Sequence, residues 1–156
     1  MAARRRQWAI GVLMAIGVVL GLSAVQGQQP LSNDEDLARQ ILAQVNDWRV
    51  SEGLAPLRPN RVLQALAEDQ AQHIRERLRS GPVVDFHVDA EGRSPRQRAV
   101  QRYGWPTYGL RDQIHIGENA AVGSVRTAMT YWRGSDIHRR AALSPVYREV
   151  GVAVLP

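Results

Sequence analysis

Residues 114–155 read IHIGENAAVGSVRTAMTYWRGSDIHRRAALSPVYREVGVAVL, and this stretch decides the fold. It holds two short runs of small and apolar residues, Ile114–Val122 and Glu149–Leu155, and each run is typical of a β-strand. Between them, Ser124 is a helix-capping residue for a helix that runs to about Arg133. One face of this predicted helix carries apolar side chains at helical spacing, namely Val125, Ala128, Met129 and Trp132.

Three further helices are predicted upstream. The first runs from about Asn33 to Glu52, behind a capping box at residues 32–35, and the second is capped by Asn60 and ends near Ser80. A third, short helix opens at Ser94-Pro95-Arg96-Gln97, which combines a cap, a proline at the first helical position and a return-bonding Gln. Helices dominate, and they do not alternate regularly with strands. The pattern therefore predicts an α+β fold rather than a parallel α/β sheet.

The composition limits the function. A chain of 156 residues is long enough for one well-buried domain, and the absence of cysteine excludes disulfides, thiolate metal sites and cysteine nucleophiles. All 20 basic residues are arginine, but three of them lie in the first six residues, which leaves 17 arginines against 15 acids. This small surplus argues against a non-specific nucleic-acid binder, so we expect no nucleic-acid partner.

The N-terminus has the layout of an export signal. Arg4-Arg5-Arg6 precede an uncharged apolar run from Trp8 to Val25, and the sequence then turns polar. We expect a signal peptide over residues 1–27, a short linker over 28–34 and one domain over 35–156. A retained N-terminal anchor is the alternative, and it would be the protein's only contact with a membrane. In both cases the domain would act outside the cytoplasm, at the cell envelope or secreted.

No single local motif assigns a chemistry. The chain has four histidines but no self-sufficient metal motif, nucleophile elbow or phosphate-binding loop. The polar residues that stand out, His87, Glu118, His138 and Glu149, are far apart in the sequence and could meet only through the fold. His73 and His115 are predicted to face solvent, because the first lies on a charged helix face and the second alternates with isoleucines.

Five segments stand out in order along the chain: Phe86-His87, residues 89–95, Gly117-Glu118-Asn119-Ala120-Ala121, residues 132–139 and residues 147–153. Together they resemble the CAP (SCP-like) superfamily of cysteine-rich secretory, antigen 5 and pathogenesis-related 1 proteins, in its short, cysteine-free bacterial form. The resemblance extends to the first helix and its proline-containing connector, and it covers residues 35 to 155.

The resemblance implies an α–β–α sandwich with a central antiparallel sheet and a cavity lined by two histidines and acidic residues. The histidines correspond to His87 and His138, and the acid to Glu118. A second cavity glutamate of eukaryotic relatives has no exact counterpart here, since only Asp136 is near its position. Asn119, Asp136 and Glu149 complete the expected cavity network. Family members continue past the last strand into a closing strand, whereas this sequence stops at Pro156, so the sheet is expected to lack that strand.

Three readings of the cavity follow. It can be a hydrogen-bonded network, a ligand or metal site, or a catalytic site. The leading function is an exported binding or interaction module whose partner is a small apolar or lipid-like molecule, a glycan or a protein. The alternative is a metal-assisted hydrolase in which His87 and His138 hold a divalent ion such as zinc and Glu118 acts as general base; otherwise no catalytic residue is expected. No cofactor is required by the leading function, and an enzyme is the less favoured reading.

Overall fold

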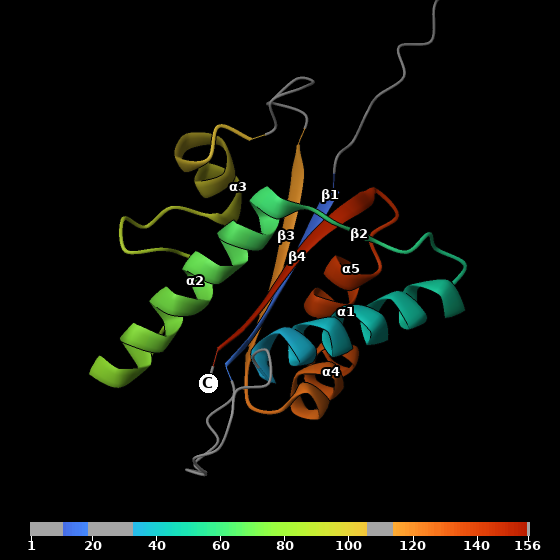
Figure 1. Cartoon of the computed structure of the whole chain (residues 1–156), viewed down its shortest axis with the longest axis horizontal. Helices are drawn as coiled ribbons and strands as arrows, with labels where there is room; N and C mark the ends of the chain where they lie inside the picture. The colour runs from blue at the N-terminus through green and yellow to red at the C-terminus, as the bar shows by residue number, and fades with distance from the viewer. Residues whose placement is uncertain (1–10, 19–32, 106–113, 156) are drawn as a thin grey trace, which may run out of the picture.

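The structure is a computed structural model that describes residues 11–18, 33–105 and 114–155. In chain order the longer elements are α1 (Asn33–Ser51), α2 (Arg61–Ser80), β3 (His115–Val122), α4 (Val125–Gly134), α5 (Asp136–Ala142) and β4 (Tyr147–Leu155). The shorter ones are β1 (Gly11–Val18), β2 (Arg58–Pro59), α3 (Pro95–Gln97) and a π-helical turn, η1 (Arg98–Arg102). Five helices and a small sheet confirm the predicted α+β class (Figure 1).

The expected antiparallel arrangement is wrong for the described strands. The sheet order is β2-β4-β1-β3, and all three pairings are parallel. The physical reason lies in the connection between β3 and β4. Because α4 and α5 carry the chain back along the sheet, β4 starts at the same end as β3, which is how parallel strands are joined. The strand between them is β1, which pairs with β3 on one side and β4 on the other.

Helices cover both faces of the sheet, and Figure 1 shows α2 on one side with α1, α4 and α5 on the other. Neighbouring strand residues point to opposite faces. Accordingly, Ala120 and Ala153 pack in the cluster under α2 and η1, whereas Ala121 and Val152 pack in the cluster under α1, α4 and α5. Trp132 of α4 is completely buried in the second cluster. The apolar face predicted for α4 therefore packs in the core of the domain.

Three of the predicted helix starts are confirmed by their caps, whereas Ser32 of the first predicted capping box lies outside the described residues. The side chain of Asn60 accepts hydrogen bonds from the amides of Val62 and Leu63 at the start of α2. Ser94 and Gln97 form the reciprocal capping box of α3, and Ser124 accepts from the amide of Thr127 in α4. These bonds satisfy amides that have no partner within the helix. The helix α5 was not predicted from the sequence.

A close approach of α2 to the sheet depends on Gly151. A Cβ atom at this position would lie 2.1 Å from the backbone carbonyl of Leu63 in α2, a distance that no packed side chain tolerates. The side-chain amide of Gln64 then bonds β4 in both directions, donating to the carbonyl of Val152 at 2.8 Å and accepting from its amide at 3.0 Å. The start of α2 is therefore held against β4 by close backbone contact. The side chain of Gln64 adds two hydrogen bonds to the backbone of Val152, as a neighbouring strand would.

The predicted export segment is described only at residues 11–18, which form β1. The proposed cleavage region and most of the linker lie outside the described residues. Among the described residues, no helix has the length and apolar character needed to cross a membrane. The division into residues 1–27, 28–34 and 35–156 remains a prediction.

Candidate functional site

A cavity of about 510 Å³ lies where the loop after α2 meets the end of β3 and the helices α4 and α5. Both predicted histidines, His87 and His138, line it. Three of the five exposed large apolar side chains among the described residues, those of Val84, Val122 and Tyr131, also lie at this cavity. The remaining lining residues are mainly small or apolar: Asp85, Phe86, Ala120, Ala121 and Thr127.

Glu118 lies beside the cavity, on the middle of β3, with a side chain that is 1% exposed. Its Oε1 is 3.0 Å from Nδ1 of His87, and its Oε2 is bound by the guanidinium of Arg98. A carboxylate removed from water needs such partners, because an unpaired buried charge is strongly unfavourable. Glu118 therefore joins the loop that carries His87 to the π-helical turn that carries Arg98.

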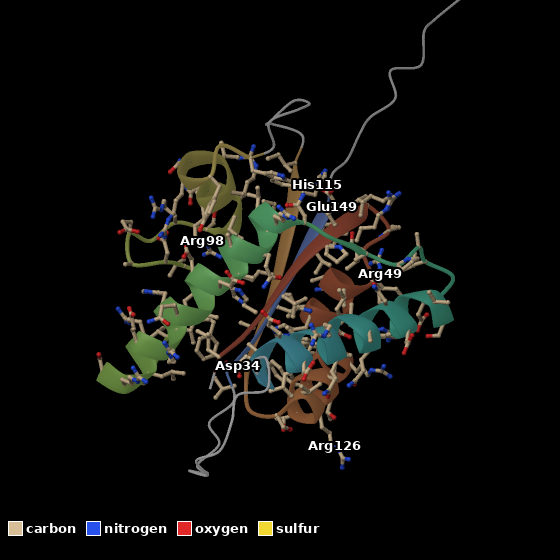
Figure 2. The ribbon with its side chains drawn as sticks, viewed as in Figure 1. Asp34, Arg49, Arg98, His115, Arg126 and Glu149 are labelled. Carbon is tan, nitrogen blue, oxygen red and sulfur yellow. The ribbon has the colours of Figure 1, made fainter. Side chains whose placement is uncertain are left out.

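Arg98 is the member of this network that sequence reasoning missed. Its side chain, labelled in Figure 2, is 2% exposed, and besides Glu118 it donates to the carbonyl of His87 at 2.9 Å and to that of Arg93 at 3.3 Å. Nothing in the charge pattern separates it from its exposed neighbours Arg96 and Arg102. The one available signal was its position directly after the capping box at Ser94–Gln97, which fixes how η1 enters the fold.

His138 reaches the cavity from α5, where it is buried. Its Nδ1 lies 2.8 Å from the hydroxyl of Ser135, and its ring packs against that of Tyr131 with centroids 4.7 Å apart. The side chain of Asn119 donates to the backbone carbonyl of His138 at 3.0 Å, which ties α5 to β3. The carbonyl oxygen of the same Asn119 side chain is buried with no hydrogen-bond partner among the described residues.

The two histidines have opposite electrostatic surroundings. The hydrogen bond to Glu118 raises the pKa of His87, against the opposing effect of partial burial. Burial lowers the pKa of His138, and the nearby charge of His87 lowers it further. Burial also raises the pKa of Glu118, an effect opposed by its hydrogen bond to His87 and by the charge of Arg98. As pH falls, His87 takes up a proton before His138 does.

The structure brings together His87, Glu118, Asn119 and His138, but not all of the predicted residues. Asp136 begins α5 and lines a separate hollow with Arg139 and Arg140. Glu149 lies near the start of β4, at the end of the sheet where His115 begins β3, and it does not line the cavity (Figure 2). Of the two histidines assigned to solvent, His115 is exposed and His73 is partly buried.

The residues present do not fit a three-ligand metal site as they are arranged. Both carboxylate oxygens of Glu118 are engaged, one by His87 and the other by Arg98. The described part of the chain contains no group of three His, Asp or Glu side chains placed to hold an ion. A metal held by His87 and His138 alone would have two protein ligands, fewer than the three of catalytic zinc sites.

The chain belongs to the CAP, or cysteine-rich secretory protein, family, whose model matches residues 42–156. The fold agrees with this assignment. A cysteine-rich secretory protein from Staphylococcus aureus superposes with a TM-score of 0.52 at 21% sequence identity, over 86% of this chain. The match spans 40% of the length of that protein. No curated protein matches this sequence.

Proposed function

We propose that this CAP domain is an exported binding module that takes a small apolar or lipid-like ligand into the cavity beside His87 and His138. The observation that carries the proposal is the composition of the cavity. Its volume of about 510 Å³ is in the range of small-molecule sites, and apolar side chains line most of it. The exposed side chains of Val84, Val122 and Tyr131 would lose their contact with water when such a ligand binds.

The polar groups at one wall of the cavity are held in a fixed arrangement. His87 is held by Glu118, and Glu118 is held by Arg98, so the imidazole at the wall is fixed before a ligand arrives. A fixed donor of this kind can orient the polar head of an otherwise apolar molecule. The proposal includes export of the domain. Its support is the N-terminal sequence, in which three arginines precede an uncharged apolar run. The described residues give no support to a metal-assisted hydrolase, because both carboxylate oxygens of Glu118 are engaged.

The test uses cis-parinaric acid, a fluorescent fatty acid, with the full chain. Thr127→Trp places a bulky ring at an exposed residue of α4 that lines the cavity, while Thr130→Trp places the same ring at an exposed residue of α4 that does not. We expect saturable binding by the wild type and by Thr130→Trp, and binding weakened at least about tenfold by Thr127→Trp. Equal binding by the two variants, or none by the wild type, would overturn the proposal.

A further inference from the structure

The arginines of the domain are concentrated in one segment. From Asn33 to Gly123 the sequence has 12 arginines and 13 acids, so this part is close to neutral. From Ser124 to Arg148 it has five arginines and one acid, which gives a net charge of +4. This second segment consists of α4, α5 and the turn into β4. The small overall surplus therefore hides a basic segment, and we call its exposed side the α4–α5 surface.

This surface faces solvent. All five arginines, at positions 126, 133, 139, 140 and 148, are exposed. Figure 2 shows Arg126 extending from α4 away from the rest of the protein. Within the described residues, Arg39, Arg93, Arg98 and Arg102 each pair with a carboxylate, whereas no ion pair is found for these five. In the part of the chain that the structure describes, four of the five have neither a carboxylate nor an aromatic ring as a partner. The exception is Arg133, which lies over the ring of Trp48 at 5.0 Å.

The helices α4 and α5 also carry two exposed large apolar side chains. Ile137 of α5 is 66% exposed and Tyr131 of α4 is 53% exposed. Exposed apolar groups set among arginines are typical of surfaces that lie on a bilayer, where cations meet lipid phosphates and apolar groups enter the headgroup layer. A soluble polyanion would match the charge but would give Ile137 no apolar surroundings. The combination thus favours a membrane over a polyanion.

We propose that the α4–α5 surface docks the domain on a bilayer that contains anionic phospholipids. This contact is distinct from the N-terminal segment, which was the only membrane contact expected from the sequence. The docking itself does not depend on what the cavity holds.

Co-sedimentation of the full chain with phosphatidylcholine vesicles, with and without 30 mol% phosphatidylglycerol, tests the proposal. The variant Arg126→Gln/Arg139→Gln/Arg140→Gln removes three exposed charges of the surface. A matched variant, Arg61→Gln/Arg77→Gln/Arg79→Gln, removes three exposed charges of α2, in the opposite layer. We expect the wild type and the α2 variant to bind anionic vesicles alike, and the surface variant to bind about tenfold or more weakly. A further variant, Ile137→Ser, should weaken the binding that survives in high salt.

The N-terminal segment is the same in every variant, so its own affinity for lipid cancels in these comparisons. Equal binding of the wild type to vesicles with and without phosphatidylglycerol would overturn the proposal. Equal losses in the two triple variants would also overturn it, since they would show a response to net charge alone. Salt-sensitive binding unaffected by Ile137→Ser would point instead to a polyanion as the partner.

Discussion

Arg98 and Glu118 form an ion pair with side chains that are 2% and 1% exposed, and the pair fixes the wall of the cavity. A pair removed from water contributes little net stability as a unit, but loss of one partner leaves the other charge buried and uncompensated. The two residues lie on η1 and β3, so the pair also holds the loop with His87 between the two elements.

Arg98→Met is expected to lower the free energy of unfolding by about 3–5 kcal/mol, because Glu118 remains buried without its cation. The control is Arg102→Met, which breaks a half-exposed pair with Asp69 and should cost about 1 kcal/mol or less. Urea denaturation measures both. The double variant Arg98→Met/Glu118→Leu should recover much of the loss. Equal effects of the two single variants would contradict the buried role of Arg98.

The ring-proton shifts of His87 and His138 should titrate on opposite sides of the ordinary histidine pKa of about 6.5. His87 should titrate above it, because of Glu118, and His138 below it, because of burial. NMR titration of the full chain measures both. His87→Ala should raise the pKa of His138, since the positive charge that lowers it is gone. A His138 that titrates above His87 would show that the cavity is arranged differently.

The raised pKa of His87 also predicts how the stability of the domain depends on pH. A raised folded-state pKa means that the folded protein binds the proton more tightly, so the contribution of His87 is fully present below about pH 6.5 and is lost as pH rises through its folded pKa. The wild type should therefore exceed His87→Gln in urea midpoint at pH 5.5 by more than at pH 8.5. The difference should be small, because the His87 side chain is 42% exposed. A difference that grows with pH would contradict the assignment.

Gly151→Ala should destabilise the domain by about 1–3 kcal/mol or more, because the new methyl group would overlap the carbonyl of Leu63, which is backbone and cannot turn aside. Gly134→Ala is the matched control, since a Cβ there meets nothing within 4 Å and alanine favours the helix. Thermal unfolding compares them. A Gly151→Ala variant as stable as Gly134→Ala would mean that α2 is farther from β4 than described.

Trp132→Ala should cost about 3–5 kcal/mol, the range for a large aromatic side chain lost from a core, since Trp132 is completely buried. Tyr131→Ala, at the exposed neighbouring position, should change the urea midpoint little. The comparison checks the phase of α4, because a rotation of the helix by one residue would exchange the two results.

Zinc binding at His87, His138 and Glu118 remains a prediction from the family resemblance. Since both oxygens of Glu118 are engaged, we expect weak binding through the two imidazoles, lost on acidification as first His87 and then His138 becomes protonated. Calorimetry at pH 7.5 should show a loss in His87→Ala and His138→Ala but not in His73→Ala or His115→Ala. Tight, stoichiometric binding by the wild type would show that Glu118 leaves Arg98 to bind metal.

Local signals predicted the elements well and the long-range arrangement less well. The caps at Asn60, Ser94 and Ser124 are determined by neighbouring residues, and the helices begin there as expected. The convergence of His87, Glu118 and His138 came from the family resemblance, since no periodicity relates residues so far apart. Arg98 could not be recognised, because burial of a charge depends on partners from other elements. Strand direction was mispredicted because it depends on how α4 and α5 return the chain.

The position of β1 has a consequence for the order in which the domain folds. Its partners His115–Val122 and Tyr147–Leu155 lie about a hundred residues or more further along the chain, so the sheet closes only after a very long loop has formed. Loop closure over such a distance is slow, and contacts of this kind lengthen folding times. If residues 1–27 act as the proposed export signal, translocation machinery would compete for the eight residues that form β1. While it holds them, β3 and β4 would each present an unpaired edge, and the nascent chain would stay open and suited to transport.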